Sequence, residues 1–228
     1  MRWPSRPHRL QERKKDNTAK RFNMIAVINY GMGNIGSIIN MLKKIGAQTE
    51  IAETPETLKR ADKILLPGVG TFDNGMKKLK ESHLIEAIQE ETLNKKKPFL
   101  GICLGMQLLG TKSEEGKEKG LNFIEFETRR FKFEENSPLK IPHMGWDMVT
   151  FQKRDNPILK DITEQQRYYF VHSYHAVCRN RENILMTCDY SYEFAAAVVK
   201  DNIYGMQFHP EKSHRFGMKL LENFVRSV

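Results

Sequence analysis

The first half of the chain repeats one pattern: a short apolar run, a turn rich in glycine or proline, and then apolar residues at helical spacing. The run Met24–Tyr30 leads into Gly31–Asn34, after which apolar residues recur every three or four positions up to Gly46. Further strand-like runs are Gln48–Ala52, Lys63–Leu66 and Pro98–Ile102. Strands that alternate with helices predict a parallel sheet covered by helices on both faces.

The second half of the chain is richer in strands and poorer in helices. The expected strands are Phe131–Phe133, Trp146–Thr150, Tyr168–Tyr174, Ile184–Cys188, Ala195–Val199 and Ile203–Gln207. The polar triplet Lys200–Asn202 predicts a hairpin between the last two. A final helix carries Phe216, Leu220 and Phe224 on one face. We therefore expect a single α/β domain with a mostly parallel central sheet flanked by helices and an antiparallel extension.

The net charge of +9 is concentrated at the N-terminus. Residues 1–22 contain eight basic and two acidic side chains, a net of +6, which leaves +3 for the rest of the chain. The basic residues are Arg2, Arg6, Arg9, Arg13, Lys14, Lys15, Lys20 and Arg21. A basic tail on a nearly neutral body is not the pattern of a nucleic-acid groove. We expect no nucleic-acid partner.

The segment 1–23 is predicted to be disordered, because it contains Pro4 and Pro7 and lacks apolar periodicity. It also lacks the apolar core and the cleavage site of a secretory signal. We expect the native protein to start at Met24, so that 1–23 is an upstream in-frame extension and 24–228 is the domain. A regulatory or targeting arm is the alternative.

Two further bulk features bear on where the chain works. No apolar run approaches the roughly 20 residues that span a bilayer, so no membrane partner is expected. The three cysteines are odd in number and widely spaced, so they predict no paired disulfide framework. They suit a reducing, cytoplasmic location.

Cys103 lies at the end of a predicted strand, with Gly101 two residues before it and Gly105 two residues after it. A nucleophile on a tight strand-to-helix turn needs small neighbours, because the turn projects the side chain and exposes the next backbone N–H to a developing oxyanion. An arbitrary cysteine is more often a buried packing residue, and we interpret Cys178 and Cys188 in that way. The context of Cys103 instead predicts a nucleophile.

A thiol nucleophile requires a base and a group that orients the base. His209 and Glu211 follow a predicted strand near the C-terminus, where a His-x-Glu pair can aim both side chains the same way. His172 and His175 are alternative bases. Their spacing also raises the question of a metal, but the residues nearby show no further ligand pattern. We predict neither a metal nor a cofactor.

The segment Gly101–Gln107, together with the His-Pro-Glu motif that begins at His209, resembles the class I (triad) glutamine amidotransferases. The resemblance covers residues 24–228. It implies a flavodoxin-like α/β glutaminase fold, L-glutamine as substrate, a γ-glutamyl thioester on Cys103 and ammonia as a product. Glu211 would complete the triad.

Four finer motifs resemble the glutaminase subunits of imidazole glycerol phosphate synthase, an enzyme of histidine biosynthesis. They are Asn29–Asn34, Pro67–Gly70, Pro142–Trp146 and Tyr169–Tyr174. This resemblance implies a heterodimer with a TIM-barrel cyclase subunit. It also implies that ammonia passes to the cyclase, which makes imidazole glycerol phosphate and AICAR.

The same resemblance implies roles for individual residues. The oxyanion hole would be formed or gated by Val69, Gly70 and Leu104. The two polar ends of glutamine would be held by Gly68, Gly70, Gln107, Ser173 and Tyr174. The cyclase would be contacted by Asn34, Met144 and Trp146.

Two segments depart from the histidine-pathway pattern. Leu121–Phe126 stands where the family usually has a turn that contains Pro-Gly, and Lys212–Gly217 also differs. The segment Lys212–Gly217 looks closer to paralogues encoded with surface-polysaccharide genes, which supply ammonia for the amidation or amidination of sugars. That pathway is the alternative function. A cysteine hydrolase or peptidase on the same fold is a third hypothesis, which Gln107 and Tyr174 argue against.

Overall fold

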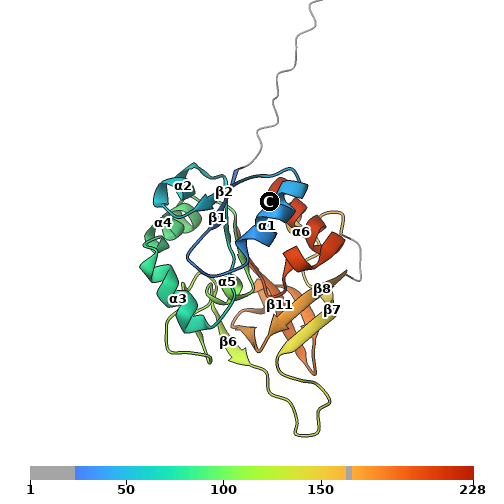
Figure 1. The fold of residues 1–228 in the computed structure, drawn as a ribbon. Helices are drawn as coiled ribbons and strands as arrows, with labels where there is room; N and C mark the ends of the chain where they lie inside the picture. The colour runs from blue at the N-terminus through green and yellow to red at the C-terminus, as the bar shows by residue number, and fades with distance from the viewer. Residues whose placement is uncertain (1–23, 163–165) are drawn as a thin grey trace, which may run out of the picture.

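The computed structural model describes residues 24–162 and 166–228, in which one mixed sheet runs through the molecule (Figure 1). The predicted leader 1–23 lies outside the described residues. The strands are β1 (Met24–Ile28), β2 (Gln48–Ala52), β3 (Lys63–Leu66), β4 (Phe99–Ile102), β5 (Lys112–Ser113), β6 (Phe126–Arg130), β7 (His143–Phe151), β8 (Gln166–His172), β9 (Tyr174–Cys178), β10 (Ile184–Asp189), β11 (Glu193–Lys200) and β12 (Ile203–Met206). The helices are α1 (Ile35–Lys44), α2 (Pro55–Arg60), α3 (Phe72–Glu81), α4 (Ile85–Gln89), α5 (Leu104–Gln107) and α6 (His214–Arg226).

The order of strands along the sheet is β2-β1-β3-β4-β12-β11-β10-β7-β8. The pairs from β2 to β12 are parallel, and the pairs from β12 to β8 are antiparallel. A smaller branch, β5-β6-β9, joins the sheet where β9 pairs with β11. The expected parallel sheet with an antiparallel extension is thus the observed fold.

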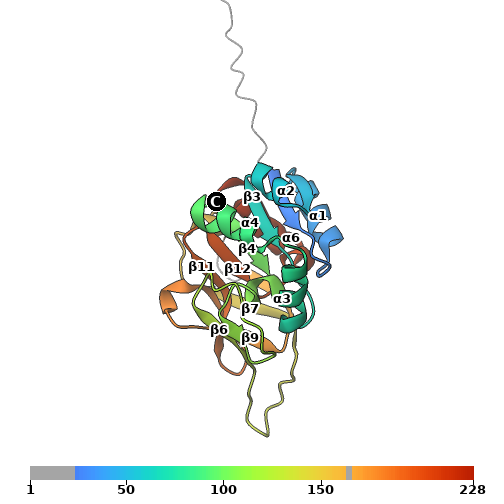
Figure 2. The same ribbon diagram turned by 90° about the vertical axis from the view of Figure 1, so that its left-hand side faces the viewer.

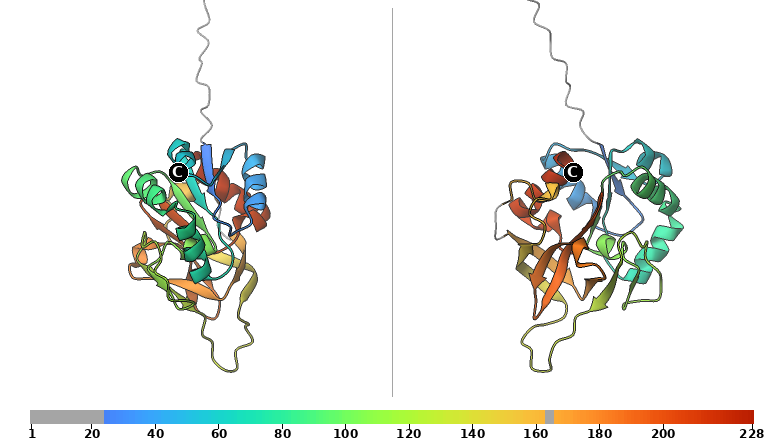
Figure 3. Two further views of the ribbon diagram at one scale, coloured as in Figure 1. Left: turned by 60° about the vertical axis from the view of Figure 1, so that its left-hand side comes forward. Right: turned by 180° about the vertical axis from the view of Figure 1, so that it is seen from behind.

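Helices cover the two faces of the parallel half because the strand side chains alternate in direction. Ile25 and Val27 pack into a core with residues of α1 and α6. Ala26 and Ile28 pack into a second core with residues of α2, α3 and α4. Figure 3 shows the two layers of helices on opposite sides of the sheet.

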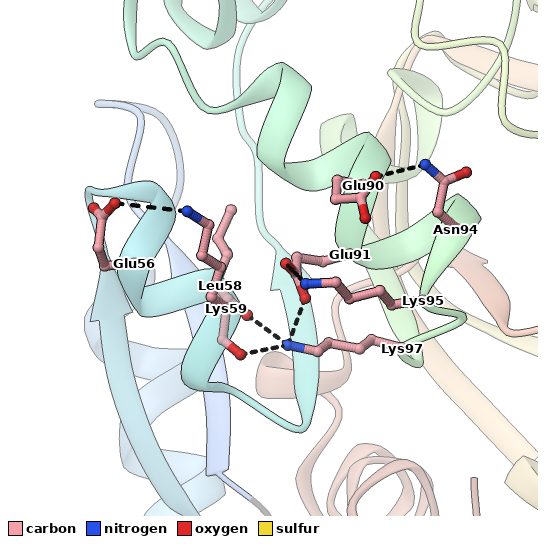
Figure 4. A network of polar contacts seen from close by, with 8 residues as sticks. All are labelled: Glu56, Leu58, Lys59, Glu90, Glu91, Asn94, Lys95 and Lys97. Carbon is pink, nitrogen blue, oxygen red and sulfur yellow. Dashed lines mark hydrogen bonds and ion pairs between the residues drawn. The ribbon is translucent and has the colours of Figure 1, made fainter.

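A network of ion pairs joins α2 to the end of α4, which continues as a π-helical turn over Glu90–Asn94 (Figure 4). The fully buried carboxylate of Glu91 accepts from Lys95 at 2.8 Å and pairs with Lys97 at 2.7 Å. The Lys97 ammonium also donates to the carbonyl oxygens of Leu58 and Lys59, at 2.9 and 2.8 Å. It therefore satisfies carbonyl groups at the C-terminal end of α2.

Two strand predictions were wrong in detail. Phe131–Phe133 is not a strand: the strand β6 ends at Arg130, and 131–142 forms a long loop that projects from the body of the molecule (Figure 2). The ring of Phe131 is nevertheless fully buried, packed 4.7 Å from the ring of His175, so its apolar character reflects core packing. The second error concerns Tyr168–Tyr174, which is divided at Ser173 into β8 and the start of β9.

Among residues 24–162 and 166–228, no helix is long and apolar enough to cross a membrane.

Candidate active site

Cys103 occupies a sharp turn between β4 and α5. Its backbone angles are φ 53° and ψ −111°, in the left-handed half of the map that non-glycine residues rarely adopt. A β-carbon on Gly101 would lie 2.6 Å from the carbonyl oxygen of Gly105, and one on Gly105 would lie 2.0 Å from that of Leu66. Only glycine fits either position. The close packing of these two glycines holds the turn that presents the thiol.

The imidazole of His209 is fixed by Glu211 and by its own backbone. His209 Nδ1 lies 2.7 Å from Glu211 Oε1, and both side chains are almost completely buried. The His209 backbone N–H donates to the carbonyl oxygen of Tyr169 at 2.9 Å. Ser213 adds a bond that sequence reasoning missed, since its hydroxyl donates to the His209 carbonyl at 2.7 Å.

The protonation of His209 depends on its two neighbours. Burial of the ring lowers the pKa of His209, whereas Cys103 and Glu211 raise it, and together these effects bring it to about 9. With such a pKa, the His209 ring is a protonated imidazolium near neutral pH. The His209 ring therefore interacts with Cys103 on one side and with Glu211 on the other.

A pocket of about 320 Å³ lies in front of Cys103 and contains most of the residues singled out from the sequence. Those that line it are Val69, Gly70, Cys103, Leu104, Gln107, Ser173, Tyr174 and His209. They come from β4, α5, the segment after β3, the β8–β9 junction and the end of β12. Gly68 and Glu211 do not line the pocket, but each is adjacent in the chain to a residue that does, Val69 and Lys212 respectively.

The backbone N–H of Leu104 already has an acceptor. It donates to the carbonyl oxygen of Gly68 at 3.3 Å, so this N–H is not free to receive an oxyanion. The next residue in the segment, Val69, is exposed to the pocket, and Gly70 has φ +113°. A turn of the Gly68–Val69 peptide would release Leu104, and the glycine on each side of Val69 makes that turn sterically easy.

Gln107 is buried and bonded to protein groups. Its amide donates to the carbonyl oxygen of Tyr174 at 3.3 Å and to Gln207 Oε1 at 3.1 Å. The Gln207 amide in turn lies 4.0 Å from the Cys103 sulfur. Gln207 was not predicted as a site residue, although its place two residues before His209 on the same segment was a usable signal.

The alternative bases, His172 and His175, have other partners. His172 Nδ1 lies 2.7 Å from the carbonyl oxygen of Tyr174, so this nitrogen carries a proton and donates it. Burial lowers the pKa of His172 to about 3, so the ring is neutral. His175 Nε2 lies 3.0 Å from the hydroxyl of Tyr192.

His172 belongs to a buried series of hydrogen-bonded side chains that ends at the partly exposed carboxylate of Asp147. Because neutral His172 donates through Nδ1, its Nε2 accepts from His143 Nδ1 at 3.1 Å. The other nitrogen of His143 lies 2.6 Å from Asp147 Oδ2, a separation that requires a proton between the two atoms. His143 itself is stacked between the rings of Phe170 and Tyr190, at 4.7 and 3.9 Å.

Comparison with known proteins fits this geometry. A profile of the family described as glutamine amidotransferase class-I matches residues 26–228. The chain is 54% identical over 205 residues to the imidazole glycerol phosphate synthase subunit HisH 2 of Methanococcus maripaludis, covering 90% of this chain and 100% of the relative. It is 50% identical, with the same coverage, to the subunit of that name from Pseudomonas aeruginosa.

The chain belongs to the class-I glutamine amidotransferases. Solved structures share the fold at lower identity. A chain in the structure of PurLQS from Thermotoga maritima matches with a TM-score of 0.69 and 18% identity, covering 89% of this amidotransferase and 97% of that chain. A glutamine amidotransferase from Thermotoga maritima matches with a TM-score of 0.59 and 21% identity, covering 89% of this chain and 82% of that one.

The residues predicted to meet a partner lie outside the pocket of this amidotransferase. Met144 and Trp146 are exposed on β7 at 61% and 37%, and Met148 continues the same face. Trp146 stacks on His214 at 5.5 Å, which places it at the surface rather than in the core. Asn34 caps α1 by accepting from the Ser37 N–H at 3.2 Å.

Two charged residues of the pocket were missed. Glu115 lines it and accepts from the backbone N–H of Phe72 at 2.8 Å. Burial raises the pKa of Glu115, the Phe72 bond opposes this, and Asp73 adds to it. Lys212 also lines the pocket, with its ammonium 5.7 Å from the ring centre of Tyr169. Glu115 lies in the segment 112–119, in which most side chains are charged, so its composition did not single out Glu115.

Proposed function

We propose that this chain hydrolyses L-glutamine to glutamate and ammonia. The Cys103 thiolate attacks the side-chain amide carbon, and the resulting tetrahedral oxygen is stabilised by backbone N–H groups. His209 gives its Nε2 proton to the leaving nitrogen, so ammonia departs and a γ-glutamyl thioester remains. A water molecule that loses a proton to His209 then attacks the thioester, which releases glutamate and regenerates the thiolate.

One observation carries this proposal. A strained, positive-φ cysteine and a buried His–Glu pair open into the same pocket, although about 100 residues of sequence separate them. Backbone strain of this kind is retained where the surrounding structure enforces it, commonly at active sites. A cysteine with only a packing role would need neither the turn nor the imidazole.

The pocket also offers groups for both ends of glutamine. The Glu115 carboxylate has one oxygen on Phe72 N–H, and the other is available for the α-ammonium group. Gly68 and Gly70 supply main-chain groups, while Ser173 and Tyr174 supply a hydroxyl and a phenol from the opposite wall. Gln107 would contribute through its bond to the Tyr174 carbonyl rather than as a free amide.

The names of the relatives favour a synthase subunit over the polysaccharide alternative. Both relatives described above are imidazole glycerol phosphate synthase subunits. We therefore infer that the ammonia passes to a TIM-barrel cyclase subunit that makes imidazole glycerol phosphate and AICAR in histidine biosynthesis. The partner would dock against the exposed face of Met144 and Trp146 and near Asn34. Genes of histidine biosynthesis next to the gene for this chain would support that pathway, and genes for sugar-nucleotide enzymes would oppose it.

The test is a glutaminase assay on the purified chain with its cyclase subunit. Cys103→Ala should abolish glutamine hydrolysis without changing the melting temperature by more than about 2 °C, since the substitution removes one atom at a nearly buried site. Synthesis from added ammonia should survive, because free ammonia bypasses the thioester. Glutamine hydrolysis that persists in the alanine variant would contradict the assignment, and cleavage of peptides by the wild-type chain would point to a peptidase.

The domain of this amidotransferase is proposed to be 24–228, so deletion of 1–23 should leave its melting temperature and its glutaminase activity unchanged. The deleted segment has no apolar face with which to join the core. Its charge is screened at ordinary salt. Differential scanning fluorimetry and the same assay test this, with the full chain as the reference. A lower melting temperature or a weaker response to the cyclase would make the segment part of the working protein.

A further inference from the structure

The side chain of Tyr30 presents a buried hydroxyl without a partner. Tyr30 is 4% exposed, and its hydroxyl makes no hydrogen bond within 24–162 and 166–228. Buried polar groups in native proteins are nearly always paired, so one that is not calls for an explanation. Burial, with a smaller contribution from Cys103, raises the pKa of Tyr30 well above its ordinary value. The hydroxyl therefore keeps its proton and can donate.

The hydroxyl lies against the segment that blocks the oxyanion site. A β-carbon on Gly68 would lie 2.6 Å from the Tyr30 oxygen and 2.8 Å from the backbone nitrogen of Gly105. A side chain at position 68 would therefore occupy the space between Tyr30 and the start of α5. The phenol approaches this closely because residue 68 is glycine.

The carbonyl of Gly68 now accepts from Leu104 N–H at 3.3 Å. To complete an oxyanion hole, this carbonyl must leave Leu104 and the Val69 N–H must turn toward Cys103. In a buried setting, the displaced carbonyl needs a new donor, since an unpaired carbonyl would oppose the turn. The Tyr30 hydroxyl lies beside Gly68 and is an unpaired donor within the described residues.

We propose that the Tyr30 hydroxyl donates a hydrogen bond to the Gly68 carbonyl oxygen when the Gly68–Val69 peptide turns, and so stabilises the conformation in which Leu104 and Val69 face the substrate. Tyr30 is thus a positioning residue that acts through the peptide and does not touch glutamine. The inference rests on the proposed glutamine hydrolysis.

The position of Tyr30 in the chain also links the turn to the outside. Tyr30 is followed by the loop that carries Gly33 and Asn34, and a β-carbon on Gly33 would lie 3.2 Å from Pro67 and 3.3 Å from Gly68 N. A protein that docks near Asn34 therefore contacts a loop packed directly on the turning segment. Tyr30 belongs to the same loop. A partner docked near Asn34 and a turn of the Gly68–Val69 peptide would therefore both act on the loop 29–34.

Tyr30→Phe tests the proposal, because it removes the hydroxyl and keeps the ring. The resting state contains no bond to lose, so the melting temperature should not fall. The turned state loses one hydrogen bond, so kcat for glutamine in the cyclase complex should fall about tenfold, with KM within twofold of wild type. Tyr168→Phe is the matched control, since the Tyr168 hydroxyl is also buried and unpaired in the described chain but is not one of the groups that lie against Gly68. It should keep the wild-type kcat.

Two outcomes would overturn the proposal. One is a wild-type kcat in Tyr30→Phe. The other is a fall in melting temperature that Tyr168→Phe does not show, because the hydroxyl would then stabilise the resting fold. If wild type itself hydrolyses no glutamine in the complex, the proposed function fails instead, and the two failures are told apart by that single measurement.

Discussion

Glu211 sets the charge of His209 as well as its orientation. Because Glu211 raises the pKa of His209, Glu211→Gln should lower it from about 9 and move the alkaline limb of the kcat–pH profile to lower pH. A histidine whose pKa is raised by folding stabilises the fold at pH values below the ordinary histidine pKa of roughly 6.5. This contribution is lost as the pH rises through about 9. The melting temperatures of wild type and Glu211→Gln should therefore differ at pH 6 and converge above pH 9.

The relative cost of losing each residue distinguishes the base from its orienting group. His209→Asn should reduce kcat by about 10²–10⁴-fold, at least as much as Glu211→Gln, because His209 moves the proton whereas Glu211 orients the ring. His172→Asn and His175→Asn are the comparisons. An equal loss in either of these, with activity retained in His209→Asn, would reject the triad.

The hydrogen-bonded series of Asp147, His143 and His172, which ends at the Tyr174 carbonyl, should stabilise the fold through His143. In His143→Phe, the new ring can keep the stacking on Phe170 and Tyr190, but His172 Nε2 loses its donor in a buried site. The free energy of unfolding should fall by about 1–3 kcal/mol. Urea denaturation measures this.

Asp147→Asn is the control for that variant. The amide of the new residue can donate to His143 Nε2, so that His143 can still donate through Nδ1 to His172. Its unfolding free energy should stay within about 1 kcal/mol of wild type. A loss in Asp147→Asn as large as that in His143→Phe would show that the shared proton, and not the bonding order, stabilises these strands.

The ion-pair network between α2 and the π-helical turn is the second test at the level of elements (Figure 4). Lys97→Met removes one partner of the buried Glu91 and the donor to the α2 carbonyls, so unfolding should become easier by roughly 3 kcal/mol. The double variant Glu91→Leu with Lys97→Met should lose less than the sum of the two single variants. Additive losses would show that the two residues are not coupled.

For the molecule as a whole, the sequence was sufficient where local pattern and tertiary structure agree. The strands β2 and β3 match their predicted bounds, because residues typical of turns stand close to them, Gly46 before β2 and Pro67 directly after β3. The segment Phe131–Phe133 was wrongly predicted to be a strand, because a buried aromatic residue in a loop has the same apolar character as one in a strand. Glu115 was missed because a polar residue on a loop gives no periodic signal, whereas Gln207 was overlooked although it stands two residues before His209.

The direction of the Gly68–Val69 peptide could not be predicted from the sequence. The motif Pro67–Gly70 predicted an oxyanion segment, but only coordinates reveal that the Gly68 carbonyl accepts from Leu104. The direction in which a peptide faces depends on contacts from distant parts of the chain, here from α5 and Tyr30. Gly68 and Gly70 on either side of Val69 permit both directions, so the residue types alone cannot choose between them.

The whole enzyme should therefore hydrolyse glutamine slowly until its partner and an acceptor are bound. With Leu104 occupied by the Gly68 carbonyl, the resting site lacks an oxyanion donor, and a single donor is worth about 10²–10³ in rate. Steady-state glutaminase activity is to be measured for the isolated subunit, for the cyclase complex, and for the complex with an acceptor analogue. The last step should raise kcat by about 100-fold or more. Trp146→Ala should show a smaller rise, because it removes an exposed aromatic anchor from the docking face. Full activity in the isolated subunit would mean that the peptide turns without a partner.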